Sequence, residues 1–357
     1  MRSFPKKLLL AASVLALACA VSEGLLRLLE PGVVGVSYQP CIYTRHEANG
    51  YAYRPGSRDR MHRFFEMDAP VAINAGGFHD VECPAGTDAS VWRVAAIGDS
   101  FTACLHVPVA DGWTQILERE LSRRRGTRGE VRNLGLDGTG TDVQVSILRA
   151  QLEKGMRIDT AILAFYGNDV DDVAMGLMYR EVVDGYVITY QDDAQRAAIV
   201  EHLEASRPAA WVAAAYRGSF LFRALCNMLR GDGLLRSNFV GPAQAGLEIE
   251  HRREPRARLE QAFRELASLA RQYSFAVLVA PVPAQHDPQG SMKALTDYVP
   301  SLVLEPFSVV DVVPAMERLL TSEHLAYQQL FWKFDGHLNA AGNRVYALAL
   351  AESLPSR

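Results

Sequence analysis

Residues Arg93 to Thr102 read RVAAIGDSFT and join an apolar run to a polar turn. A short apolar run that ends at a glycine predicts a buried strand, and the polar residues after it predict a turn. The turn presents Ser100, whose hydroxyl is nearly inert at neutral pH unless an imidazole takes its proton and a carboxylate orients that imidazole. His337 and Asp335 offer both groups near the C-terminus. The sequence therefore contains every residue type that a serine nucleophile requires.

The order of these groups along the chain, serine, then aspartate, then histidine, also occurs in α/β-hydrolases. Those enzymes place the serine in a Gly-x-Ser-x-Gly turn. In this chain Thr102 stands where the second glycine belongs, and the α/β-hydrolase fold is therefore disfavoured.

Two further segments strengthen the serine motif. They read NLGLDG from Asn133 to Gly138 and YGND from Tyr166 to Asp169. Together with GDS at Gly98–Ser100 and DGH at Asp335–His337, they resemble the four blocks of the SGNH or GDSL family of serine hydrolases. The resemblance is to the membrane-attached bacterial branch of that family.

The resemblance implies a role for each matched residue. Ser100 is the expected nucleophile, His337 the base, and Asp335 the acid that completes the triad. The expected oxyanion hole consists of the N–H groups of Ser100 and Gly138 and the side-chain amide of Asn168. These residue types suit their roles, because a glycine N–H can approach a substrate closely and an amide donates without acting as a base.

The chain departs from the usual family pattern at one point. Most members place the acid three residues before the histidine, whereas Asp335 lies two residues before His337. The run DGHLN resembles membrane-attached bacterial members and also carbohydrate O-acetyltransferase relatives. The choice between a hydrolase and a transferase therefore stays open.

Each motif alone also fits an ordinary turn. Asp99 or Ser100 can cap a helix, Asn133 and Asn168 can cap loops, and the DGH run can be a surface turn. Four blocks in the family's order, three of them after predicted strands, favour a real site. The nine histidines are scattered, with no His-x-x-x-His or Cys-x-x-Cys pair, so the sequence predicts neither a metal site nor a cofactor.

Composition indicates a globular protein that does not bind nucleic acid. The 357 residues are 49% hydrophobic and 22% charged, which is enough for a sizeable core. The formal net charge of −4 provides no basic field for a nucleic acid. The one basic run, Arg252–Arg258, is interpreted as the solvated start of a helix.

The N-terminal segment, residues 1–30, predicts export. Three basic residues precede a charge-free apolar run, Leu8–Ser22, and Ala18–Ala20 fits a secretory cleavage site. The run becomes long enough for a membrane anchor if it continues past Glu23. Acylation of Cys19, as in a lipoprotein, is a weaker alternative. The charges predict that the remainder lies outside the cytoplasm, on the periplasmic or cell-surface side, tethered by this segment.

An oxidising compartment allows disulfides among the other cysteines. Cys41 and Cys83 lie in the same irregular region, so we favour a bridge between them and leave Cys226 unassigned. Cys104 is interpreted as a core residue, because no motif ties a histidine or lysine to it.

Residues 31–90 predict a loop-rich subdomain, because glycine, proline, aromatic and charged residues occur there without a sustained period. Two segments in it, Gly50–Gly56 and Ile73–Asp80, resemble the lead-in of membrane-attached bacterial SGNH proteins. His79 is either an ordinary loop histidine, which we favour, or a residue that lines the cleft.

Residues 91–357 alternate between strand and helix patterns. The expected strands are 91–97, 131–136, 160–165, 275–281 and 307–312, and the expected helices are 111–124, 141–154, 255–272 and 340–354. This alternation predicts an α/β fold with a central parallel sheet covered on both faces. The resemblance implies a flavodoxin-like three-layer α/β/α sandwich, the SGNH hydrolase fold. The motif residues would then meet at the carboxyl edge of the sheet.

An insertion at about 170–250 carries two partly apolar segments that look helical, Trp211–Tyr216 and Phe220–Leu225. It is either a lid-like or membrane-facing insertion or a helical pair packed on the sheet edge.

These observations lead to one functional expectation and two alternatives. The expectation is an exported serine esterase that cleaves acyl esters, with O-acetyl groups on a glycan favoured. The first alternative is a carbohydrate O-acetyltransferase with the same acyl-serine intermediate. The second is a non-catalytic, membrane-anchored glycan-binding or assembly protein. The expected partners are a small-molecule or glycan ester, the membrane, and proteins of polysaccharide biosynthesis or export.

Overall fold

Five parallel strands form the centre of the protein. The computed structural model describes residues 4–29, 42–63, 67–82, 90–126, 128–175, 179–183, 186–190, 192–206, 211–212, 215, 218–222, 224–225, 239–240 and 253–354. The strands of the central sheet are β5 (Trp92–Gly98), β6 (Gly129–Asn133), β7 (Thr160–Ala164), β11 (Ala276–Val279) and β12 (Ser308–Val309). They lie in the order β12-β11-β7-β5-β6, and every neighbouring pair is parallel. This is the doubly wound strand order of flavodoxin-like folds, so the predicted fold class is confirmed.

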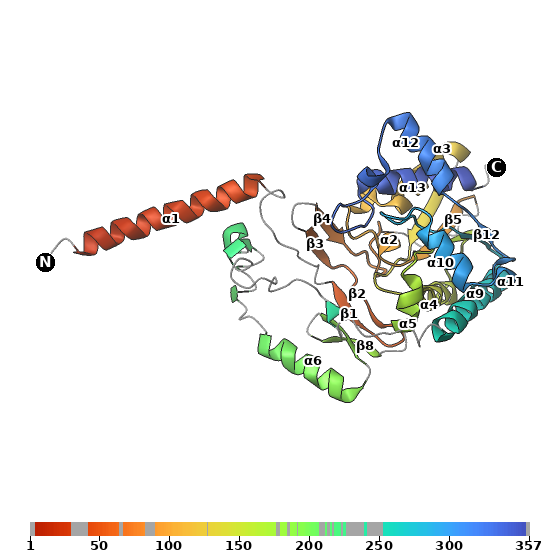
Figure 1. Ribbon diagram of the computed structural model, residues 1–357, viewed down its shortest axis with the longest axis horizontal. Helices are drawn as coiled ribbons and strands as arrows, with labels where there is room; N and C mark the ends of the chain where they lie inside the picture. Colours follow the sequence, from red (N-terminus) through yellow and green to blue (C-terminus); the bar gives the residue numbers. More distant parts are fainter. Residues whose placement is uncertain are drawn as a thin grey trace.

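Helices cover both faces of this sheet, as Figure 1 shows. They are α3 (Trp113–Arg125), α4 (Thr141–Glu153), α9 (Arg253–Tyr273), α12 (Val313–Glu323) and α13 (Ala340–Ser353). Alternate residues of β5 divide between two apolar cores. Ala95 and Ile97 belong to the core with α4 and α9, while Val94 and Ala96 belong to the core with α3, α12 and α13. The strand pleat therefore builds one core on each side of the sheet and gives the three layers.

Shorter elements connect the layers. They are α2 (Ser100–Ala103), η1 (Val109–Asp111), α5 (Asp169–Met175), α10 (Gly290–Tyr298), α11 (Ser301–Leu304) and η3 (Tyr327–Leu330). The strand expected at 131–136 begins and ends earlier, at Gly129 and Asn133. Residues 134–138 are therefore a loop, which places Gly138 beyond the carboxyl end of β6.

The region expected to be loop-rich holds two antiparallel strand pairs. These are β1 (Tyr43–His46) with β2 (Gly50–Tyr53) and β3 (Arg58–Arg63) with β4 (Met67–Ala72). In β4, buried and exposed residues alternate along Met67–Ala72. That period of two identifies a half-buried strand. The alternation is hard to recognise in the sequence, because the composition of the region is mixed.

The insertion contains strands as well as helix. Its elements are β8 (Tyr179–Val183), β9 (Tyr186–Tyr190), α6 (Asp193–Ser206) and β10 (Phe239–Val240). The three strands form a separate sheet in the order β10-β9-β8. Much of the two segments expected to be helical there, Trp211–Tyr216 and Phe220–Leu225, lies outside the described residues.

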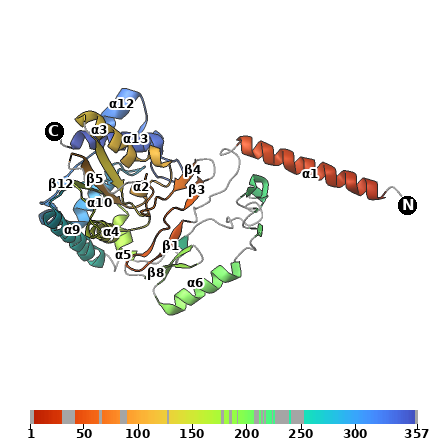
Figure 2. The ribbon, with the colours of Figure 1, turned by 180° about the vertical axis from the view of Figure 1, so that it is seen from behind.

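The N-terminal helix α1 (Phe4–Leu29) projects away from the sheet domain in both views (Figures 1 and 2). Its segment Lys6–Leu28 is long and apolar enough to cross a membrane, and it is not buried in the protein. Near its end the Glu23 carboxylate accepts hydrogen bonds from the backbone N–H groups of Phe220 at 3.1 Å and Leu221 at 2.9 Å. These contacts attach the insertion to the domain-proximal end of α1.

The expected Cys41–Cys83 bridge falls outside the described residues, as does Cys226. It therefore stays a prediction.

Candidate active site

Ser100 lies at the carboxyl end of β5 and is the first residue of α2. Its N–H has no partner within the helix, because the first N–H groups of a helix point outward. The Asp99 side chain caps α2 by accepting the Phe101 N–H at 2.9 Å. At Gly98 a Cβ would come within 2.1 Å of the Thr102 hydroxyl, so the turn requires a glycine before the aspartate.

Ser100, His337 and Asp335 form a continuous chain of hydrogen bonds. The distance from Ser100 Oγ to His337 Nε2 is 2.8 Å, and His337 Nδ1 lies 2.5 Å from Asp335 Oδ1. The structure thus brings together three residues that the sequence separates by 237 positions. This is the arrangement in which an imidazole can accept the serine proton while a carboxylate stabilises the charge.

The loop that carries the acid and the histidine turns tightly. Gly336 between them has a φ of 86°, a left-handed conformation that glycine adopts without strain. The Gly336 N–H donates to the Trp332 carbonyl at 2.8 Å, and the Trp332 N–H donates to the His337 carbonyl at 2.8 Å. This local geometry lets an acid only two residues before the histidine reach the imidazole.

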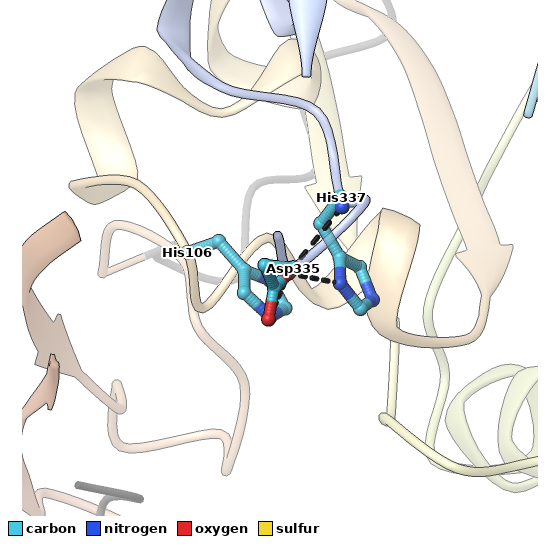
Figure 3. Close-up of side chains that lie close together, drawn as sticks. All are labelled: His106, Asp335 and His337. Atoms are coloured by element: carbon cyan, nitrogen blue, oxygen red, sulfur yellow. Dashed lines mark hydrogen bonds and ion pairs between the residues drawn. The ribbon is translucent and has the colours of Figure 1, made fainter. Parts of the chain in front are cut away.

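A second histidine, His106, completes the surroundings of the triad. Its Nε2 lies 3.5 Å from Asp335 Oδ1, and its ring stacks on the His337 ring with centroids 3.8 Å apart. Figure 3 shows His106, Asp335 and His337 gathered together. Sequence reasoning missed His106, because a lone histidine six residues after the serine belongs to no motif.

The two other expected oxyanion residues lie at the same edge of the sheet. Gly138 follows β6 and has a φ of 66°. Asn168 follows β7, and its side chain is hydrogen-bonded to Asp99, the neighbour of Ser100. Parallel strands β6, β5 and β7 thus deliver Gly138, Ser100 and Asn168 to one carboxyl edge, as the sequence predicts.

Three tyrosines of the β1–β2 hairpin surround the residue before Gly138. The Asp137 carboxylate accepts hydrogen bonds from the hydroxyls of Tyr43 at 2.6 Å and Tyr53 at 2.5 Å, and the Asp137 carbonyl accepts one from Tyr51 at 2.6 Å. Burial raises the pKa of Asp137, and the tyrosine hydroxyls oppose that rise. The hairpin is therefore docked on the loop through polar groups.

Two clusters among the described residues have a donor set that a metal ion could use. The first is His106, Asp335 and His337, where the two ring nitrogens of His337 already contact Asp335 and Ser100. The second is Asp99, Asp169 and Asp172, a group of buried carboxyls. Burial raises the pKa of each of the three, and repulsion from Asp99 adds to the rise at Asp169 and Asp172. Burial therefore favours the protonated forms of these carboxyl groups.

Three other residues make structural contacts. His79 is buried, and its Nδ1 lies 2.9 Å from the carbonyl of Ala103, the last residue of α2. Cys104 is a buried free thiol whose pKa burial raises to about 12, in agreement with the predicted core role. Asp311 accepts hydrogen bonds from Gln289 and Val313.

Comparisons with known proteins give matches among solved structures alone, since no family model and no curated protein matches the chain. TesA is similar at 16% identity over 73% of this chain and 97% of its own, with a TM-score of 0.40. A member of the lipolytic protein G-D-S-L family from Veillonella parvula DSM 2008 has 12% identity over 73% of this chain and 97% of its own, with a TM-score of 0.36. A two-domain esterase (CEX) active on acetylated mannans has 12% identity over 73% of this chain and 48% of its own, with a TM-score of 0.38.

Proposed function

We propose that this chain is a serine esterase of the SGNH or GDSL type, exported and held at the membrane by α1. The observation that carries the proposal is the contact of 2.8 Å between Ser100 Oγ and His337 Nε2, continued at 2.5 Å to Asp335. The four blocks of sequence that resemble this family contain all three residues. A serine with this pair of neighbours is activated for attack on an ester carbonyl.

The reaction proceeds in two acyl transfers. Ser100 Oγ attacks the ester carbonyl while His337 Nε2 takes its proton, and a bond forms between Oγ and the acyl carbon. His337 then returns the proton to the leaving alcohol as the ester bond breaks. Water repeats the sequence on the acyl-serine and releases the acid. Asp335 holds the Nδ1–H of His337 and stabilises the imidazolium in both steps.

Each tetrahedral intermediate has an oxyanion that needs donors. The Ser100 N–H at the start of α2, the Gly138 N–H and the Asn168 amide are the proposed donors. Removing one such donor typically costs about 3 to 4 kcal/mol of barrier. Asp99 supports the hole twice, since it caps α2 and is hydrogen-bonded to the Asn168 side chain.

The proposed substrate is an acyl ester, with an O-acetyl group on a glycan favoured by the resemblance of the DGHLN run. The proposed location is the periplasmic or cell-surface side of a membrane. The length and apolar character of Lys6–Leu28 support a membrane-inserted helix. The contacts of Glu23 with residues 220 and 221, and the exposed Trp211, support an insertion that faces the membrane. Proteins of polysaccharide biosynthesis or export are the proposed partners there.

An O-acetyltransferase would use the same acyl-serine and differ only in the acceptor. The test therefore incubates the full chain, in detergent micelles, with an acetylated glycan and an added unacetylated oligosaccharide. Free acetate supports the esterase, and acetate on the oligosaccharide supports the transferase. Neither product, with a chromogenic acetyl ester also left intact, would support the non-catalytic alternative.

A further inference from the structure

The peptide unit that carries the Gly138 N–H is held by a tyrosine from outside the hydrolase-like domain. The Tyr51 hydroxyl, in β2, lies 2.6 Å from the Asp137 carbonyl oxygen and 3.0 Å from the Gly138 carbonyl oxygen. Tyr51 is fully buried, and burial raises the pKa of its hydroxyl above the ordinary value. The hydroxyl therefore stays protonated, and available to donate, across the working pH range.

Peptide geometry links this contact to the oxyanion hole. A trans peptide points its C=O and its N–H in opposite directions within one plane. The Asp137 carbonyl shares its plane with the Gly138 N–H, so a donor fixed on that carbonyl fixes the direction of the N–H. Gly138 needs such help, because a residue without a Cβ rotates freely and its φ of 66° is one of several accessible values.

A second donor holds the next peptide. Nη1 of Arg180, in β8, lies 2.7 Å from the Gly138 carbonyl oxygen. The backbones of β2 and β8 meet closely here, since a Cβ on Gly50 would lie 2.3 Å from the Arg180 carbonyl oxygen. Tyr51 and Arg180 therefore approach successive carbonyls of one loop from two segments that are far apart in sequence.

We propose that Tyr51, assisted by Arg180, is a positioning residue that aims the Gly138 N–H at the oxyanion. This inference rests on the proposed function, because it requires Gly138 to be an oxyanion donor. The hydrogen bond to the Asp137 carbonyl also polarises the peptide and strengthens its N–H as a donor. On this account Tyr51 of β2, which lies before residue 91, contributes to stabilisation of the transition state.

The competing account is that the tyrosines only dock the hairpin. Tyr43 is the matched control, since it lies in the same hairpin, is equally buried and donates to the Asp137 carboxylate rather than to a peptide carbonyl. A docking role affects the melting temperature of both variants and leaves kcat unchanged. A positioning role affects kcat in Tyr51→Phe and leaves KM unchanged, because the oxyanion exists in the transition state and not in the bound ester.

The experiment compares the full chain with Tyr51→Phe and Tyr43→Phe. It measures kcat and KM on p-nitrophenyl acetate, the rate of phosphonylation by a fluorophosphonate, and the melting temperature. We expect Tyr51→Phe to lower kcat and the phosphonylation rate by about tenfold or more, part of the effect of losing an oxyanion donor. KM should change by less than about threefold, and Tyr43→Phe should retain kcat to within about threefold.

A kcat for Tyr51→Phe within about threefold of the wild type would overturn the inference and leave the esterase intact. A wild-type chain that neither hydrolyses the ester nor reacts with the fluorophosphonate would overturn both. If Tyr51→Phe fails to fold, Arg180→Met takes its place, because it removes the other donor from a different strand. An unchanged kcat in Arg180→Met would then overturn the inference.

Discussion

Nε2 of His106 lies 3.5 Å from the same Asp335 oxygen that binds His337 Nδ1. The two imidazole rings stack with an interplanar angle of 13°. His106 therefore contacts both Asp335, the proposed acid, and His337, the proposed base. A second contact of this kind restrains the carboxylate and leaves it better aligned with the imidazole of His337.

The variant His106→Phe tests this role, because phenylalanine keeps the stacked ring and loses the nitrogen that faces Asp335. We expect kcat to fall by about fivefold, which corresponds to about 1 kcal/mol, the typical net contribution of one polar contact. The melting temperature should change little. Steady-state kinetics on a small acetyl ester give the answer, and an unchanged kcat would show that His106 only fills space.

The identity of the acid is tested by two aspartate-to-asparagine variants. Asp335→Asn should lower kcat by roughly 10³-fold or more, because an amide neither selects the tautomer of His337 nor stabilises the imidazolium. Asp311→Asn is the matched control, since Asp311 binds Gln289 and Val313 and not the histidine. Full activity in Asp335→Asn would remove this residue from the triad.

The role of Asn168 is tested by comparing a neutral and a negatively charged substitution. Asn168→Ala removes one donor and should lower kcat by about 10²-fold to 10³-fold. Asn168→Asp should be worse, because a carboxylate there repels the developing oxyanion and also faces the buried Asp99. The comparison uses turnover numbers under saturating ester. Equal activity of the wild type and Asn168→Asp would reduce Asn168 to a loop cap.

His79 should make the stability of the protein depend on pH. Burial lowers its pKa from 6.5 to about 4, so the unfolded state binds a proton more readily than the folded state. The free energy of unfolding therefore decreases by about 3 kcal/mol in total as the pH falls from about 6.5 to about 4. Asp80 acts in the opposite sense, because burial raises its pKa to about 7.

The variant His79→Gln isolates the contribution of the histidine to the pH dependence, because the wild type and the variant both contain Asp80. Urea unfolding at pH 7.5 and pH 4.5 should show a smaller loss in His79→Gln than in the wild type. Identical losses in the two proteins would mean that His79 is accessible to protons in the folded state.

The sequence predicts the central sheet well, because residues such as Val94–Ile97 and Ala161–Phe165 form continuous apolar runs that end at glycine-containing turns. The strands β5, β7 and β11 lie within a few residues of the predicted ranges. The edge strand β12 is shorter than expected, Ser308–Val309, because a strand with one neighbour has fewer backbone partners to extend it. The hairpin β1–β2 was missed, because its tyrosines pack into the core and hydrogen-bond to Asp137, which lies in a loop far away in sequence.

The three proposed triad residues could be predicted because Ser100 lies in the GDS motif and Asp335 and His337 lie in the DGH motif. His106, Tyr51 and Arg180 could not, since each acts across more than forty residues of chain and only the folded sheet brings it to the site. Their roles depend on distances to Asp335 and to the Asp137–Gly138 peptide. The residues that neighbour each position in sequence do not determine such distances.

The assignment of Ser100 as the nucleophile is tested by the site of covalent labelling with a fluorophosphonate. The full chain is treated in detergent micelles, digested and analysed by mass spectrometry, with Ser100→Ala in parallel. We predict a single phosphonylated peptide that contains Ser100 in the wild type and no labelling in Ser100→Ala, with an unchanged melting temperature. Labelling that persists in Ser100→Ala, or a wild type that carries the label on another residue, would contradict the assignment of Ser100 as the nucleophile.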